Sequence, residues 1–453
     1  MHKITLKDMP YVELGDIRRN QRLITIVENI SSQPGNSIPK LSDSWYEAKA
    51  TYEFFKNEEV TIQRLQEIIQ QYGVSQLKEE QEILVVHDIS NISFNDLQAE
   101  NLGYLDRKEG RGIMCYSSLA ISPQGLPLAL LYQQSWMRPL SDLEKELKKS
   151  KGKRPFEEKQ SYRWYEGMTE TGKLLSDKVH KIHIADREAD VYELFFRASE
   201  PGTDLLIRAY HNRQLSDGNQ LWDSVGAMEE QPERLKIPVW NGKGKNREIE
   251  VSVRYQPVEI LRPATNKTSY ESVELTAIEI RQEAEGIREE DRICWRLLTS
   301  LEVNTVNDVA KYVRWYSYRW LIERFHYVLK SGTQIEQLQL KQASSLQKAI
   351  AVYSLAAFSI MQVVYQSRST PEVSCEVILT KSEWQVLYML KHKNNHVPEQ
   401  PPTLQQAVMW IGRLGGHLGR NSDGPPGLKT VWLGYEVLTN ATNVYEIMNQ
   451  KFG

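Results

Sequence analysis

The sequence predicts an α/β fold for the middle of the chain, between two helical regions. Over residues 83–208, three short apolar runs, the last two joined by the turn SPQG, precede a helical pattern and then alternating strand and helix patterns. That order is the one expected of a ribonuclease-H-like domain. Apolar alternation over residues 209–292 predicts a β-strand insertion. We therefore expect helical residues 1–70, a ribonuclease-H-like domain over 71–368 and a helical domain over 369–453.

Composition describes an ordinary folded protein and leaves the class of partner open. The chain has 453 residues, 40% apolar and 25% charged, and a net charge of −3, so any DNA binding must come from local basic patches. Cys115, Cys294 and Cys375 lie far apart, which argues against a disulfide framework and a zinc site and suits a reducing compartment. The first residues have no apolar secretory pattern, and we expect a cytoplasmic protein.

The N-terminal region carries two helical patterns. Asp16 can cap the first helix, which places Arg18 and Arg22 one turn apart on one side. A second helix follows from Ser42, with its aromatic side chains packed elsewhere. Basic residues on one face suit a small DNA-contacting domain, and a plain helical subdomain fits the same pattern.

The central domain contains two apolar runs that each end in an acid, Asp88 and Asp186. The predicted strands are residues 83–88, 112–122, 126–136, 180–186 and 203–210, and the predicted helices are 155–178 and 189–199. The second and third strands should form an antiparallel hairpin, because only a short turn joins them.

The insertion shows the clearest strand periodicity in the chain. Its residues on one face are Ile249, Val251, Val253 and Tyr255. Residues 271–283 continue the strand pattern. After a final apolar run at 294–302, either Asn304 or Thr305 can cap the helix that follows.

Residues 312–332 predict one uninterrupted helix that ends at Gly332. At about 100° per residue, Tyr316, Arg319, Glu323 and Lys330 fall within an arc of roughly 60°. The opposite side is apolar and consists of Leu321, Ile322, Phe325, Val328 and Leu329. A solvated face is the ordinary interpretation of such a stripe. One carboxylate among two cations and a phenol instead indicates a metal ligand beside donors for an anion.

The C-terminal region is helical and carries no catalytic pattern. The apolar stretch 349–365 contains Ser354, Ser359 and Gln362 and is too short for a membrane span, so we expect a buried helix. Two amphipathic patterns follow a polar boundary near residue 369. We expect a packing or partner domain there.

Three carboxylates are candidates for phosphodiester chemistry. Cleavage and strand transfer use two Mg²⁺ ions roughly 4 Å apart, held by hard oxygen ligands from separate elements. Asp88, Asp186 and Glu323 supply such ligands. Asp88 can instead be a turn or cap residue, and Glu188 and Asp190 are rivals to Asp186 in the same segment.

The spacing Tyr316-x2-Arg319-x3-Glu323-x6-Lys330 resembles the Y-R-E-K signature of bacterial insertion-sequence transposases of the DDE type, in the group of transposon five. The segments DREAD at 186–190 and HDISNIS at 87–93 match the family's regions around its first two acids. The resemblance runs from residue 14 to residue 416. It implies a cut-and-paste DNA transposase in which Asp88, Asp186 and Glu323 are catalytic and hold two Mg²⁺ ions, for which Mn²⁺ can substitute.

The resemblance also implies how DNA is held. Tyr316, Arg319 and Lys330 would contact the backbone near the cleaved end, and Trp295 would stack on a base flipped out during hairpin formation, although a buried sheet tryptophan fits the same position. Further candidate DNA contacts are Arg208, His211 and Arg213 after the fifth strand, and Arg18 and Arg22 in a domain that recognises transposon ends.

The implied partners are double-stranded transposon-end DNA, target DNA and a second copy of the chain, which dimerises through the C-terminal domain. No membrane is implied. Two other functions fit the acids or the DNA-binding pattern. One is a ribonuclease-H-like structure-specific nuclease without transposition, and the other is a domesticated DNA-binding protein without catalysis.

Overall fold

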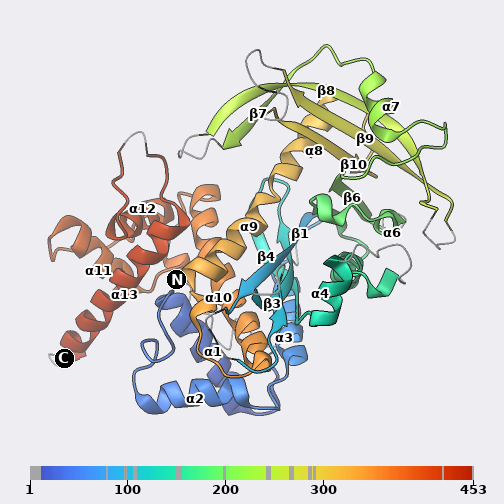
Figure 1. Cartoon of the computed structure of the whole chain (residues 1–453). Coiled ribbons are helices and arrows are strands. Elements are labelled where there is room, and N and C mark those ends of the chain that lie inside the picture. Colours follow the sequence, from blue (N-terminus) through green and yellow to red (C-terminus); the bar gives the residue numbers. More distant parts are fainter. Residues whose placement is uncertain are drawn as a thin grey trace.

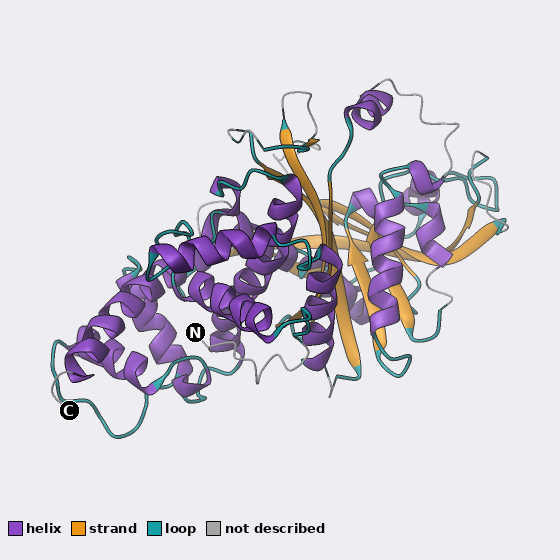
Figure 2. Cartoon of the chain, turned by 90° about the horizontal axis from the view of Figure 1, so that it is seen from below, coloured by secondary structure: helices purple, strands orange, loops and turns teal. Residues whose placement is uncertain are grey.

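The computed structural model centres on one sheet with helices on both of its sides (Figure 1, Figure 2). It describes residues 12–77, 80–95, 97, 99–105, 110–147, 156–196, 200–240, 246–264, 270–283, 288, 292–420 and 423–450. The strands follow the order β2-β3-β1-β5-β6-β10-β9-β8-β7, and β4 pairs with β3.

The first half of the sheet has the predicted ribonuclease-H-like arrangement. Its strands are β1 (Glu82–Ser93), β2 (Gly103–Tyr104), β3 (Arg111–Ile121), β4 (Pro127–Trp136), β5 (His180–Ala185) and β6 (Thr203–Arg208). Strand β3 pairs antiparallel with β1 and β4, as the hairpin prediction requires, whereas β1, β5 and β6 run parallel. Parallel strands end at one edge, so residues after β5 and β6 come together there.

Strand β1 is longer than its apolar run. It continues to Ser93 and pairs with β3 throughout, so that Asp88 lies opposite Ser117 in the middle of the strand. The prediction that Asp88 ends its strand is therefore wrong. Pairing with β3 keeps the polar residues after Asp88 in the ladder, although their side chains lack the apolar pattern of a core strand.

The helices between these strands are shorter than predicted. The segment expected as one helix over 155–178 contains a 3₁₀ turn, η2 (Phe156–Glu158), and α5 (Tyr162–Leu174). The helix expected over 189–199 consists of the turn η3 (Arg187–Ala189) and a single turn, α6 (Tyr192–Phe195), and its residues 197–199 lie outside the described part. Helix α4 (Leu140–Leu147) follows β4.

The insertion is built into the same sheet. It comprises α7 (Leu221–Ala227), β7 (Leu235–Trp240), β8 (Asn246–Leu261) and β9 (Ser272–Gln282). Strand β10 (Cys294–Thr299) pairs antiparallel with both β6 and β9 and so joins the insertion to the central strands (Figure 1). Of the four residues predicted to share one face, Ile249, Val251 and Val253 are buried and Tyr255 is half-buried.

The N-terminal helices are α1 (Ile17–Ser32), α2 (Trp45–Lys56) and α3 (Ile62–Ser75). The Asp16 side chain accepts a hydrogen bond from the backbone of Arg18, which confirms the predicted cap. These helices pack on the long helix α10 (Ala343–Ser369), where Lys348 Nζ donates to the carbonyl of Asn57 at 2.8 Å. The N-terminal region is thereby attached to the helix that packs against β4 of the sheet.

The segment 312–332 is three pieces and not one helix. Helix α8 (Val306–Ser317) begins at Thr305, which forms a capping box with Asp308, so Thr305 is the cap. Helix α9 (Trp320–Tyr327) follows a tight turn, and a π-helical turn, η6 (Val328–Gly332), ends the segment. At the break the backbone N–H of Arg319 donates to the carbonyl of Tyr316 at 3.0 Å. This hydrogen bond joins residues three apart, as in a 3₁₀ helix, and so tightens the turn.

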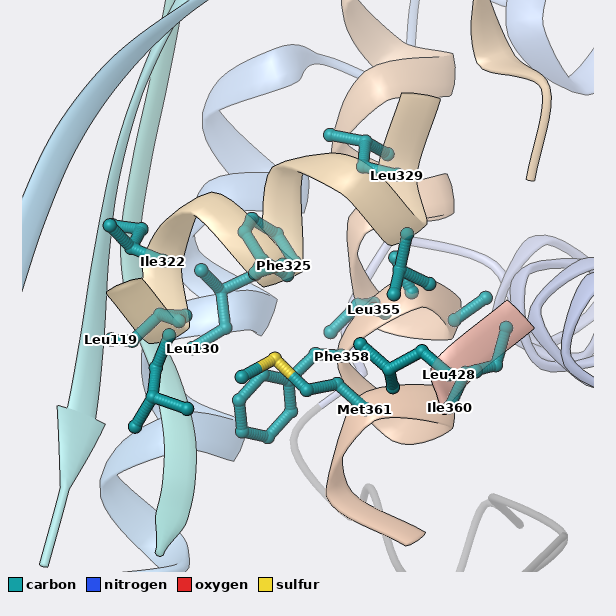
Figure 3. Close-up of a cluster of buried hydrophobic side chains, with 14 of the residues drawn as sticks. Leu119, Leu130, Ile322, Phe325, Leu329, Leu355, Phe358, Ile360, Met361 and Leu428 are labelled. Carbon is teal, nitrogen blue, oxygen red and sulfur yellow. The ribbon is translucent and has the colours of Figure 1, made fainter. Parts of the chain in front are cut away.

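Helix α9 buries its apolar side against the sheet and α10. Ile322, Phe325 and Leu329 lie in one cluster with Leu119 and Leu130 of β3 and β4 and with Leu355, Phe358 and Met361 of α10 (Figure 3). This contact fixes the side of α9 that faces away from the core, and Glu323 lies on that side. The turns η7 (Ile335–Gln337) and η8 (Cys375–Val377) flank α10 in the chain.

Helix α10 is the buried helix that the apolar stretch predicts. Among the described residues it is the one helix whose length and hydropathy, 1.5 over its most apolar window, would allow a membrane crossing, and 78% of that window is buried inside the fold. Burial against the sheet and the flanking helices explains its apolar surface.

The C-terminal region consists of α11 (Lys381–His392), α12 (Leu404–Leu414) and α13 (Leu428–Gln450). Two glycines let α12 and α13 approach closely, because a Cβ on Gly415 or Gly434 would lie 1.9 or 1.7 Å from a backbone oxygen of the other segment. Tyr435 donates to Glu383 at 2.5 Å within this module. The module contacts α10 and lies beside the N-terminal helices (Figure 1).

Candidate active site

The registers of three neighbouring strands bring two of the candidate acids together. Strand β1 pairs with β5 so that Val86 is level with Ile184. Asp88 lies two residues after Val86, and Asp186 lies two residues after Ile184. Asp88 is held within β1 by its pairing with β3, and Asp186 is the first residue after β5. The two carboxylates therefore occupy the same level of adjacent parallel strands.

The environment of Asp186 disfavours its charge. Burial raises the pKa of this carboxyl above its ordinary value, and the charge of Asp88 raises it further. A hydrogen bond from the Glu188 backbone, at 2.9 Å, and the charge of Arg319 act in the opposite direction. A cation placed between the two carboxylates would relieve this repulsion.

Asp190 differs sharply from Asp186, although both belong to the DREAD segment. Its carboxylate accepts from the backbones of Tyr210 and His211, each at 2.7 Å, and from Arg213 Nε at 3.0 Å. The residue is 3% exposed. Its oxygens are saturated by these donors, so Asp190 is a structural carboxylate and Asp186 stands as the candidate ligand of this segment.

Glu323 reaches the same region from α9, where it is paired with Arg319. Arg319 Nη2 lies 2.6 Å from Glu323 Oε1 across one helical turn. Burial opposes the charge of Arg319, yet the neighbouring Tyr316, Glu323 and Asp88 raise its pKa above the ordinary value. The guanidinium thus interacts with carboxylates from both α9 and β1, which connects the third candidate acid to the first.

His326 is a residue that the sequence analysis did not identify. Its Nδ1 lies 3.4 Å from Asp88 Oδ2 and its Nε2 lies 3.3 Å from Ser117 Oγ, and the side chain is buried. It follows Glu323 by three residues, and this spacing on one helical face was the signal that could have found it. His326 therefore links the helix that carries Glu323 to the strand that carries Asp88.

Tyr316 and Trp295 lie together at the side of this site. Their rings meet edge to face with centroids 5.3 Å apart. Burial raises the pKa of Tyr316, while Arg319 and Arg208 lower it. Tyr316 is only 4% exposed, so the open polar stripe predicted for one continuous helix does not form. Tyr316 is buried before the break that precedes α9, and Arg319 and Glu323 are half-buried after it.

The remaining predicted DNA contacts are distributed unevenly. Arg208 ends β6, and His211 is exposed just beyond it. Arg213 is buried in its pair with Asp190, so in this conformation its guanidinium is not available to a phosphate. Lys330 stands in η6 and is near enough to Cys115 to lower its pKa, which burial raises to about 12.

The two arginines of the N-terminal region lie apart from the acids. Arg18 is exposed on α1, and Arg22 Nη1 lies 3.8 Å from Glu47 of α2. Helix α1 packs mainly against α2, α10 and α13. These arginines therefore belong to a separate surface from the one around Asp88 and Asp186.

The donor set suits a hard divalent cation in chemistry, because all three candidate ligands are carboxylates. Within the described part of the chain, however, no three His, Cys, Asp or Glu side chains already lie close enough to hold a metal ion. The Glu323 carboxylate already accepts a hydrogen bond from the Arg319 guanidinium. Binding of one metal ion by all three acids would require Glu323 to exchange that partner for the ion.

Three family models match the chain in succession. A transposase DNA-binding model matches residues 4–60, a transposase DDE-domain model matches 131–358, and a Tn5 transposase dimerisation-domain model matches 355–445. The DDE match covers 228 of 453 residues, which is half of the chain.

A solved structure gives a more distant likeness. The cryo-EM structure of the piggyBac transposase synaptic complex with hairpin DNA matches 81% of this chain and 67% of that chain, at 8% identity and a TM-score of 0.37.

Together the three models match residues 4–60 and 131–445, and Asp186 and Glu323 lie within the DDE-domain match. The chain belongs to the DDE transposase family: it is a metal-dependent DNA transposase with a DNA-binding region before the catalytic domain and a dimerisation region of the Tn5 type after it.

Proposed function

We propose that this transposase moves DNA by a cut-and-paste route, in which transposon ends are cleaved through a hairpin intermediate and the 3′-OH ends are joined to target DNA. The observation that carries the proposal is the level placement of Asp88 and Asp186 on adjacent parallel strands, with Arg319 connecting Glu323 to them. Carboxylates from three separate elements are what phosphoryl transfer at one site requires.

Asp88, Asp186 and Glu323 would hold two Mg²⁺ ions, or Mn²⁺ in their place. When bound, these ions supply Lewis-acid stabilisation of the attacking and leaving oxygens. The chain prepares the site by keeping the two strand carboxylates side by side and by keeping Glu323 neutralised through Arg319 until a cation arrives. His326 would keep the Asp88 carboxylate oriented toward the same point.

The cations around the acids would position the DNA backbone. Arg319 can bind a phosphate by its planar fork once Glu323 is released, and Lys330 and Arg208 can act as further positive charges. Tyr316 would orient Arg319 from its buried position, and Trp295 beside it would stack on a base flipped out at the cleaved end. His211 adds an exposed donor at the same edge.

The flanking regions would assemble the complex. Residues 1–70 would recognise double-stranded transposon-end DNA, with Arg18 and Arg22 on α1 as phosphate contacts. The catalytic domain would span 71–368, and residues 369–453 would hold two copies together while both ends are bound. We expect the protein to work in the cytoplasm, at the bacterial nucleoid.

The test is cleavage of a plasmid that carries the gene with its flanking DNA, in Mg²⁺ and in Ca²⁺, with Asp186→Asn as the control. Excised DNA with hairpin ends in Mg²⁺, absent in Ca²⁺ and in the variant, is the expected result. Tight binding without cleavage in Mg²⁺ or Mn²⁺ would contradict it and favour a domesticated DNA-binding protein. Cleavage unrelated to the flanking ends would favour a structure-specific nuclease.

A further inference from the structure

The turn that follows strand β6 is rigidly held at the edge of the site. Its residues 209–213 are fastened by Asp190, which accepts the backbone N–H groups of Tyr210 and His211 and pairs with Arg213. Arg213 Nη2 also donates to the carbonyl of Asp190 at 2.8 Å. These charge-assisted bonds fix the backbone of the turn.

The strand registers place this turn next to the candidate acids. Ala185 of β5 is level with Ile207 of β6, so Arg208 is level with Asp186. On the other side, Leu297 of β10 is level with Arg208. The backbone of Ala209 continues that ladder by donating to the carbonyl of Arg296 at 2.8 Å. One residue further in this antiparallel register, Tyr210 is level with Trp295, near the first residue of β10.

Tyr210 is strongly exposed although its backbone is fixed. The residue is 61% exposed, and its ring meets only the edge of the neighbouring His211 among the ring contacts of the described residues, at 5.1 Å between centroids. Packing in the core therefore does not account for an aromatic side chain here. An exposed aromatic ring on a fixed backbone, two residues after Arg208, is suited to stacking on a nucleobase.

We propose that Tyr210 is a second stacking surface for an unpaired base of the end DNA, next to Trp295, and that Asp190 is the positioning residue that holds it there. This inference rests on the proposed function, because the unpaired base arises at a cleaved transposon end. Trp295 is half-buried against Tyr316, whereas Tyr210 is exposed.

The experiment uses the full chain and duplexes that carry the DNA flanking the gene. Each duplex has a single 2-aminopurine at one position near the cleaved end, and binding is measured in Ca²⁺ by fluorescence. Stacking on Tyr210 should quench one of these positions. Tyr210→Ala should abolish that quenching and weaken binding between about 5-fold and about 150-fold. Tyr210→Phe, which keeps the ring, should retain both.

Tyr270→Ala serves as the matched control, because Tyr270 is also exposed, at 54%, but its ring is already stacked on Phe196 with centroids 4.1 Å apart. This variant should leave the quenched position unchanged. A melting curve of each variant separates a folding defect from a lost contact.

Two outcomes separate this inference from the proposed function. If the wild type excises the flanked gene in Mg²⁺ and Tyr210→Ala keeps both the affinity and the quenching, the stacking role of Tyr210 is overturned and the transposase function stands. If the wild type neither binds nor cleaves the flanking ends, both are overturned.

Discussion

Two arginine–carboxylate pairs lie within the same half of the molecule and behave differently. In the pair Arg213–Asp190 the side chains are 7% and 0% exposed, and Asp190 also accepts two backbone N–H groups. In the pair Arg319–Glu323 the side chains are 15% and 33% exposed, and the two residues are one turn apart on α9. The first pair is enclosed and fully bonded, and the second is open on one side.

The difference shows how one fold uses the same two side-chain types for opposite purposes. A buried pair with every oxygen bonded cannot lose a partner without leaving an uncompensated charge in the protein interior. A partly exposed pair contributes only about 0–1 kcal/mol to folding, so its members can exchange partners. Asp190 therefore stabilises the edge of the site, while Glu323 is free to change from arginine to a cation.

The largest effect should come from removing the charge of an open carboxylate. Glu323→Gln and Asp186→Asn should each lower cleavage of flanked plasmid DNA by about a thousand-fold or more, because several kcal/mol of transition-state stabilisation depend on these ligands. Thermal unfolding of Glu323→Gln should change little, since Glu323 is in the open pair. Full cleavage by either variant would show that the metal is held elsewhere.

The enclosed pair should give the largest effect on stability. Asp190→Ala leaves Arg213 without its buried partner and should lower the free energy of unfolding by about 3–5 kcal/mol. Urea unfolding followed by tryptophan fluorescence measures the change. The control is Glu188→Ala, an exposed acid two residues away, for which a change within about 0.5 kcal/mol is expected. Equal effects of the two substitutions would contradict the comparison.

In the open pair, a substitution should change metal binding more than it changes stability. Arg319→Gln should change the free energy of unfolding by at most about 1 kcal/mol. It should also strengthen Mn²⁺ binding in the absence of DNA, because Glu323 no longer has a competing cation and Arg319 no longer repels the ion. Calorimetric titration of wild type and variant measures this. Weaker Mn²⁺ binding by Arg319→Gln would indicate that Arg319 orients Glu323 for the ion.

The smallest effect should be a pH dependence of stability. The pKa of Asp186 is raised in the fold, chiefly by burial, so the folded chain binds its proton more tightly than the unfolded chain does. Asp186 therefore destabilises the fold increasingly as pH rises from its ordinary pKa to the raised one. In EDTA, the melting temperature of Asp186→Asn minus that of wild type should grow over this interval and then level off. A difference that shrinks with rising pH would contradict the assigned cause.

Local patterns were sufficient for many of these elements. The apolar run before Asp186 predicts β5, the alternation of Ile249, Val251 and Val253 predicts β8, and Asp16 predicts a helix start, all as found. Each of these features depends on neighbours a few residues away, and short-range periodicity records them directly.

Two of the mispredicted elements have determinants that lie far along the chain. Strand β1 continues past Asp88 because β3 supplies a partner for each further residue. The break before α9 carries no Gly or Pro signal, and α9 instead lies where Ile322 and Phe325 pack against β3, β4 and α10 (Figure 3). Tertiary pairing and packing outweighed local preference in both places.

The sequence by itself determined which residue types could carry the chemistry: an acid after each of two apolar runs, and a third acid with an arginine one turn before it. Only the tertiary structure decided which side chains are paired, buried or exposed. It saturates Asp190, pairs Glu323 with Arg319, buries Tyr316 and aligns Tyr210 with the end of β10. The physical reason is that the availability of a charged side chain depends on donors and burial supplied by distant strands, and a one-dimensional pattern does not contain those contacts.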